Sequence, residues 1–166
     1  FSPRQLRLNL LSVIYFLPLL YFQPTHIKMN NFSLSVIDVG QGSSLLIQTK
    51  NHNLLYDLGP IFISGGSATQ SAVMPYLNGQ KIKKIDRLII SHQDSDHVGD
   101  IYAFLRRYPK TPILTSAIKK LGVLPNVSPC IAGQKWHWDG VTFKVLFPLT
   151  QPYLGNNHES CVLLVK

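Results

Sequence analysis

The stretch Ser91-His92-Gln93-Asp94-Ser95-Asp96-His97-Val98-Gly99-Asp100 follows a short apolar run at residues 87–91 and precedes a segment with helical character at residues 98–107. Its metal-ligand side chains are His92, Asp94, Asp96 and His97. Carboxylates crowded this closely repel one another, and a bound cation removes that penalty. Imidazole suits zinc and carboxylate suits manganese, so the mixed set predicts one of these ions. The alternative is a solvated loop in which Asp96 caps the following helix.

The composition describes a folded chain with few acidic residues. Of 166 residues, 45% are hydrophobic and 14% are charged, which excludes a disordered chain and corresponds to about one domain. Lys and Arg number 16 and acidic residues 8, giving a formal net charge of +8. Two cysteines, Cys130 and Cys161, are too few for a disulfide scaffold. The sequence leaves open whether they pair.

The N-terminal segment is apolar. Residues 8–22 carry no charge, and Arg4 and Arg7 stand before them. This pattern predicts that residues 1–24 form the C-terminal end of a membrane-spanning region and that residues 25–31 form a linker. With the arginines inside, the following chain would lie outside the cytoplasm. A signal sequence and a buried helix are the alternatives.

Short strand signals dominate the rest of the chain. Residues 32–39, 45–49 and 54–58 predict a meander of three strands. Further strands are expected at residues 87–91, 112–115, 142–147 and 160–165, and helices at residues 71–77 and 98–107. Strands followed by strand–helix alternation predict a layered α/β fold.

Several segments resemble known families. The pattern His-x-Asp-x-Asp-His-x-Gly resembles the metal motif of the metallo-β-lactamase fold, with Asp94 as a more restricted variant at the second ligand position. Segments similar to ComEC-type DNA-internalisation competence proteins are VIDVGQG (36–42), LYDLG (55–59), VMPYL (73–77), IKKIDRL (82–88), VLFP (145–148) and NN before SCVL (156–163). The resemblance implies a metallo-β-lactamase-like αββα sandwich over residues 32–166, truncated to its N-terminal part and preceded by the end of a transmembrane helix.

The resemblance also implies a function. In such proteins single-stranded DNA enters through a membrane channel, and this domain acts as the nuclease that degrades the other strand. The implied location is the bacterial inner membrane, with the soluble domain on the extracytoplasmic side. The implied partners are the DNA phosphate backbone, the channel region of the same chain and competence DNA-receptor proteins.

The resemblance also implies a role for each residue whose position matches the family's metal motif. His92 and Asp94 would bind one divalent ion, zinc or manganese, and Asp96 and His97 a second. Asp96 and His97 are also the expected catalytic residues. Support from neighbouring strand ends is expected from Asp57 and Asp38.

The chain departs from the family pattern at two positions. Ser43 stands where an aspartate is usual, and Asp100 where a second glycine is usual. An additional aspartate and a distal histidine would lie beyond residue 166. Two alternatives therefore stay open: a non-catalytic DNA-binding or gating module of the same fold, and another metal-dependent hydrolase of the lactonase or thioesterase type.

Basic residues flank the metal motif in the sequence. The predicted nucleic-acid contacts are Lys83, Lys84, Arg87, Arg106 and Arg107. Basic surfaces attract phosphate backbones, although the same residues also provide solubility. The run Trp136-His137-Trp138 permits base stacking. Strand alternation instead predicts both indole rings in the core, with His137 on the opposite face.

Overall fold

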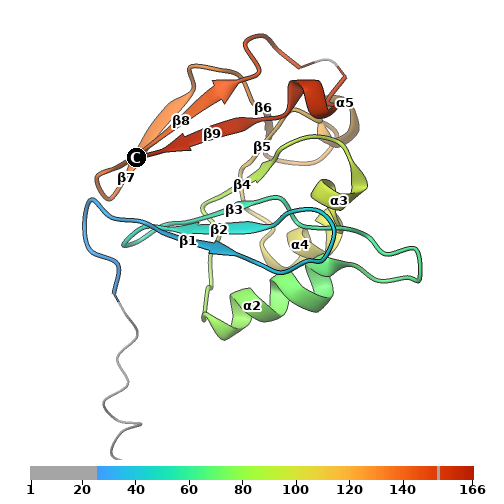
Figure 1. The fold of residues 1–166 in the computed structure, drawn as a ribbon, viewed down its shortest axis with the longest axis horizontal. Coiled ribbons are helices and arrows are strands. Elements are labelled where there is room, and N and C mark those ends of the chain that lie inside the picture. The colour runs from blue at the N-terminus through green and yellow to red at the C-terminus, as the bar shows by residue number, and fades with distance from the viewer. Residues whose placement is uncertain (1–25, 153) are drawn as a thin grey trace, which may run out of the picture.

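The computed structural model describes residues 26–152 and 154–166. Two β-sheets stack face to face, and helices cover the outer face of the larger one (Figure 1). The larger sheet has the order β1-β2-β3-β4-β5-β6 and the smaller one β7-β8-β9. The strands are β1 (Ser33–Val36), β2 (Leu45–Gln48), β3 (Asn53–Tyr56), β4 (Arg87–Ile90), β5 (Ile113–Thr115), β6 (Val127–Pro129), β7 (Lys135–Trp138), β8 (Val141–Phe147) and β9 (Val162–Val165). The helices are η1 (Thr69–Val73), α2 (Met74–Gly79), α3 (Ser95–Val98), α4 (Ile101–Arg107), α5 (Ile118–Leu121) and η2 (Asn157–Glu159).

The larger sheet is mixed. Strands β1, β2 and β3 form the predicted antiparallel meander, and β3 to β6 run parallel. Parallel neighbours need crossover connections, and the helices from η1 to α5 lie in these connections. Because β3 and β4 are parallel neighbours, the residues that follow them emerge at the same edge of the sheet. The predicted layered α/β architecture is confirmed.

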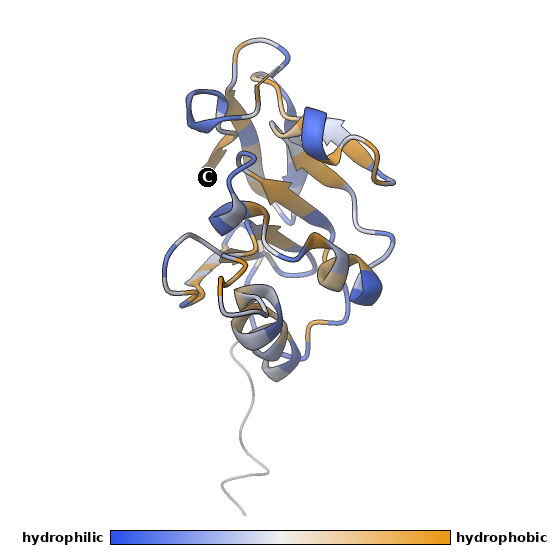
Figure 2. Cartoon of the chain, turned by 90° about the vertical axis from the view of Figure 1, so that its right-hand side faces the viewer, coloured by the Kyte–Doolittle hydropathy of each residue, from blue (hydrophilic) through white to orange (hydrophobic). Residues whose placement is uncertain are grey.

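Strand β4 is buried on both of its faces. Leu88 and Ile90 pack against the helices, whereas Ile89 packs in a second core between the sheets. Successive side chains of a strand point to opposite faces, so a strand between two apolar layers needs a nearly continuous apolar run. Figure 2 shows hydrophobic segments along the central strands of the molecule.

Two cross-links join the sheets. Cys130, just after β6, forms a disulfide with Cys161, just before β9, with a Cα–Cα distance of 5.9 Å. Both cysteines are fully buried. At the other end of the sheets, the Asp139 carboxylate accepts hydrogen bonds from Thr49, Asn51 and His52 in the β2–β3 hairpin. The sequence left open whether Cys130 and Cys161 pair, and the structure shows that they do.

The helix predicted at residues 98–107 is shorter than expected. Gly99 has a φ of 55° and packs against Gly59 and Thr69 where a side chain would collide, so it separates α3 from α4. Asp100, rather than Asp96, caps α4 by accepting a hydrogen bond from Ala103 N. The alternative in which Asp96 caps the helix is therefore wrong.

The helix predicted at residues 71–77 is longer than expected. It extends from Thr69 to Gly79 as η1 and α2. Pro75 lies in the first turn of α2, where its missing N–H costs little. The predicted membrane segment at residues 1–24 lies outside the described residues. Within the described ranges, no helix is long and apolar enough to cross a membrane.

Candidate metal centre at the end of β4

The metal motif begins where β4 ends. Ser91 and His92 are buried, with 4% of each exposed. The chain then turns, and α3 presents Asp96 and His97 beside His92. The structure therefore brings the four predicted ligands together at the carboxyl edge of the larger sheet.

The four predicted ligands lie as two pairs. His92 Nε2 is 3.3 Å from Asp94 Oδ2, and His97 Nε2 is 3.7 Å from Asp96 Oδ2. The two imidazole ring centres are 4.1 Å apart. In the described part of the chain, no three His, Cys, Asp or Glu side chains converge closely enough to hold one ion. Each pair thus offers one nitrogen and one carboxylate.

Asp57 organises the inner side of this centre. It follows β3, has a φ of 60° and is 1% exposed. Its Oδ2 lies 2.7 Å from His97 Nδ1 and accepts hydrogen bonds from Ser91 Oγ and Ser43 Oγ. Its Oδ1 accepts from Ser91 N at 2.7 Å. When neutral His97 donates Nδ1–H to this carboxylate, its Nε2 lone pair is left facing outward.

The electrostatics of the loop favour positive charge. The hydrogen bond with Asp57 raises the pKa of His97, burial opposes this rise, and the charges of Asp57, Asp96 and Asp94 add to it. Ser91 Oγ lies 2.9 Å from His92 Nδ1, so both imidazoles are held from their Nδ1 side. The Nε2 atom of each imidazole therefore remains available to bind a cation.

The turn at residues 40–43 packs against α3. Gly42 has a φ of 102°, and a Cβ there would collide with the backbone carbonyl of Asp96. Ser43 Oγ lies 3.1 Å from His97 Nδ1, in addition to its bond with Asp57. Asp38 is exposed and accepts a hydrogen bond from Gly40 N. Asp38 thus shapes the turn and, among the described residues, makes no hydrogen bond with the four ligands.

The segment between β8 and β9 completes the surroundings of the loop. Gly155 O accepts a hydrogen bond from Gln93 N, and Cys161 N donates to Ser91 O. Asn157 Nδ2 lies 3.3 Å from Asp94 Oδ2. No local pattern in the sequence indicates the contact of Asn157, because its partner Asp94 lies in the loop that follows β4, 63 residues away.

Lys120 is a basic residue beside the loop that the predicted contacts did not include. It is exposed on α5, and its Nζ donates a hydrogen bond to Gln93 O at 2.9 Å.

The predicted basic contacts lie away from the metal loop. Lys83, Lys84 and Arg107 line one groove beside the beginning of β4, and Arg106 is exposed next to it on α4. The metal motif follows the opposite end of β4, so these residues flank it in the sequence but not in space. Arg87 faces the smaller sheet and lies over Trp136.

Trp136 and Trp138 lie on the inner face of the smaller sheet. Both pack on Phe143, with ring centres 5.3 Å and 5.2 Å apart, and His137 is exposed on the opposite face. The prediction that the two indole rings share a core face is confirmed.

The family model of the metallo-β-lactamase superfamily matches residues 37–165. The chain belongs to the metallo-β-lactamase superfamily. It is 34% identical to Recombination protein 2 of Haemophilus influenzae over 162 residues, which cover 96% of this chain and 20% of that protein. It is 33% identical to Competence protein ComA of Neisseria gonorrhoeae over 163 residues, covering 98% and 22%. The chain thus spans about a fifth of these curated relatives.

A solved metallo-β-lactamase from Cronobacter sakazakii shares this superfamily fold. It is 20% identical, with a TM-score of 0.56, and the match covers 78% of this chain and 56% of that one. The predicted fold and the predicted resemblance to competence proteins of the ComEC type are confirmed.

Superfamily proteins bind divalent metals such as zinc and iron. The donor set here fits such an ion, because imidazole nitrogen and carboxylate oxygen are ligands that zinc and manganese accept. His92 with Asp94 and His97 with Asp96 are the residues that would hold it. Each pair supplies two ligands and needs others to complete a coordination shell.

Proposed function

We propose that this chain is the metal-dependent nuclease domain of a DNA-uptake protein, where it degrades the strand that is not transported. The observation that supports this most is the pairing of two histidine Nε2 atoms with two carboxylates on one loop, with Asp57 and Ser91 behind them. The printed names of the two relatives refer to recombination and competence. The net charge of +8 suits a polyanionic substrate.

The chain's own residues would divide the work of phosphodiester hydrolysis. Divalent ions, when bound, would supply charge stabilisation and an activated water. Asp57 fixes the orientation and protonation of His97, and Asn157 restrains Asp94. Asp96 and His97 would orient the attacking water. Lys120 Nζ, at the edge of the loop, would offset phosphate charge.

We also propose that the domain lies on the extracytoplasmic side of the cell membrane. The Cys130–Cys161 disulfide supports this side, because disulfides persist in oxidising compartments and are rare in the cytoplasm. Residues 1–24 would be the end of the membrane region and residues 25–31 the linker. The channel region of the whole protein and competence DNA-receptor proteins would be its partners.

The test is cleavage of linear DNA by the domain with Mn²⁺ or Zn²⁺. We expect metal-dependent products that EDTA abolishes, and a loss of about 10²–10⁴-fold in rate for His92→Ala and Asp96→Ala. Gln93→Ala is a matched control in the same loop, because Gln93 contacts its neighbours through backbone atoms. Cleavage of lactones or thioesters without cleavage of DNA would instead support the other hydrolase class.

A second candidate is a non-catalytic DNA-binding or gating module. It is favoured by Ser43, which stands where the family pattern has an aspartate. DNA binding that is unaffected by EDTA, with no cleavage under any metal, would support this candidate.

A further inference from the structure

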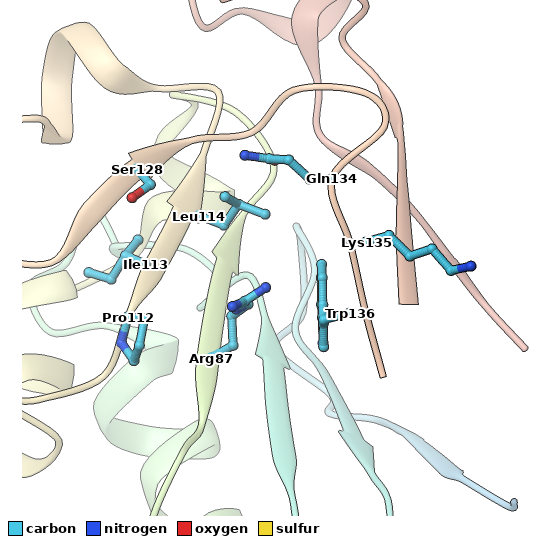
Figure 3. A pocket seen from close by; sticks show the side chains of 8 residues that line it. All are labelled: Arg87, Pro112, Ile113, Leu114, Ser128, Gln134, Lys135 and Trp136. Atoms are coloured by element: carbon cyan, nitrogen blue, oxygen red, sulfur yellow. The ribbon is translucent and has the colours of Figure 1, made fainter. Parts of the chain in front are cut away.

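Arg87 is a cation placed between two sheets. It is the first residue of β4, and alternation along that strand points its side chain to the same face as Ile89, towards the smaller sheet. The guanidinium Cζ lies 4.1 Å from the ring centre of Trp136 and 5.9 Å from that of Trp138. Figure 3 shows the guanidinium beside the face of the Trp136 ring.

In the part of the chain that the structure describes, this cation has no anionic partner. Among the described residues, the Arg87 side chain makes no ion pair or hydrogen bond, and its recorded contacts are with the two indole rings. Burial lowers the pKa of Arg87, yet a guanidinium stays charged in proteins. A half-buried cation is costly unless it is paired, and stacking on an indole ring offsets only part of that cost.

Trp136 and Gln134 are polar neighbours of Arg87. The Trp136 Nε1 donor is buried and has no hydrogen-bond partner in the described part of the chain. Gln134 uses its side-chain carbonyl to accept from Ile131 N and its amide to donate to Pro129 O. Neither group makes a hydrogen bond with the guanidinium in the described part of the chain.

Arg87 and Trp136 line a cavity of about 360 Å³. Pro112, Ile113 and Leu114 form its opposite wall (Figure 3). Small-ligand pockets have volumes of roughly 300–1,000 Å³, with mostly apolar walls and a few polar groups that orient the ligand. This cavity has that character, with the guanidinium as its charged group.

The outer surface beside the cavity is basic. Lys135 points away from the cavity in Figure 3, and the β7–β8 register places Lys144 opposite it. Like charges directly opposite one another are destabilising in a sheet. A positive surface at the rim raises the local concentration of anions.

We infer that the Arg87 cavity binds a phosphate group and, if the proposed function holds, that this phosphate belongs to a DNA strand. The guanidinium Cζ lies 4.1 Å from the centre of the Trp136 ring, and the planar N–H fork of arginine suits bidentate contact with oxyanions. The cavity is separate from the metal loop. Arg87 and His92 stand at opposite ends of β4, about 16 Å apart at ~3.3 Å per residue.

Tryptophan fluorescence tests this site, because both tryptophans of the chain lie against Arg87. Inorganic phosphate and a short oligothymidylate are titrated separately in EDTA, with sodium chloride at matched ionic strength as the salt control. We expect a saturable signal with both ligands and none with chloride. Arg87→Met should weaken both affinities by about 10-fold or more, because the charged fork is lost.

Two variants make the result specific. Arg87→Lys keeps the charge but not the fork, so we expect an intermediate affinity. Lys28→Met is the charge control, since Lys28 is exposed before β1 and does not line the cavity, and phosphate binding should be unchanged. Circular dichroism shows whether each variant folds. If Arg87→Met does not fold, Arg87→Lys carries the test.

The outcomes separate this inference from the proposed function. An absent saturable signal, or Arg87 variants that bind like the parent chain, would overturn the cavity as a phosphate site. Binding of free phosphate without the oligonucleotide would overturn the assignment to DNA. Failure of metal-dependent cleavage leaves these titrations unaffected, because they are made without metal.

Discussion

His97 Nδ1 lies 2.7 Å from Asp57 Oδ2, although 40 residues separate the two in the sequence. The contact joins α3 to the end of β3, and Ser91 and Ser43 donate to the same carboxylate oxygen. Asp57 therefore connects three segments behind the candidate metal centre. Removal of the Asp57 carboxylate should therefore weaken the candidate metal centre while leaving the Nε2 atoms of His92 and His97 in place.

Asp57→Asn should weaken metal binding while keeping the backbone conformation. Asparagine tolerates the positive φ of this position, but its amide replaces a carboxylate that orients His97. We expect a decrease of about 10–100-fold in affinity for Mn²⁺ or Zn²⁺, measured by calorimetry. Asp38→Asn is the control, because within the described ranges Asp38 makes its hydrogen bond inside its own turn, with Gly40 N. Equal affinities for Asp57→Asn and the parent chain would contradict this role.

Titration of His97 should change stability and metal affinity in opposite directions: as pH rises, stability should fall and metal affinity should rise. Its pKa in the folded metal-free chain is raised above 6.5. The protonated form therefore adds stability that is full below pH 6.5 and lost as pH rises through the folded pKa. Metal binding needs the neutral imidazole, so affinity should rise over the same interval. Thermal melting of the parent chain and His97→Gln from about pH 5 to about pH 9 measures the first effect.

A stability difference that grows with pH between these two metal-free chains would contradict the raised pKa. NMR titration of the imidazole protons provides the direct check. The same titration in Asp57→Asn should show a lower pKa for His97, because its strongest hydrogen bond is lost.

The position of the loop at residues 91–97, between a buried strand and a helix, was predictable from sequence because the pattern that indicates it is local. The run at residues 87–91 had to be buried on both faces, and ligands that follow a buried strand must emerge at a sheet edge. The break at Gly99 was not predictable, since it depends on contacts with Gly59 and Thr69 from a different crossover. Asn157 and Asp139 were missed for the same reason: their partners lie 63 and 90 residues away in the sequence.

Removal of the disulfide should destabilise the domain substantially. The bond closes a segment with a sequence separation of 31, and loop-closure entropy predicts a loss of about 3–4 kcal/mol in the free energy of unfolding. Urea unfolding of Cys130→Ala/Cys161→Ala measures it. A reducing agent should produce a similar loss in the parent chain and none in the double variant. Unchanged stability in both experiments would show that stacking of the sheets does not need this bond.

Asp139 should contribute to acid stability. Burial alone would raise its pKa, but hydrogen bonds from Thr49, Asn51 and His52 outweigh burial and lower the pKa well below its ordinary value of 3.8. The resulting stability is present above pH 3.8 and lost as pH falls through the folded pKa. Asp139→Asn keeps a residue that suits the positive φ of 51°. We expect this variant to melt at a lower temperature than the parent near neutral pH, with the difference narrowing in acid. A difference that does not vary with pH would contradict the lowered pKa.

The loop at residues 91–97 follows β4 of the larger sheet and bonds to the segment before β9 of the smaller sheet, since Gln93 N donates to Gly155 O and Cys161 N donates to Ser91 O. A ligand bound to this loop therefore contacts a segment that links the two sheets. By thermodynamic linkage, any ion or nucleotide that binds this loop more tightly when the sheets are docked stabilises their docking by the same free energy. A bound ligand would then slow amide hydrogen exchange in β8 and β9 and stabilise the packing of the two sheets against each other.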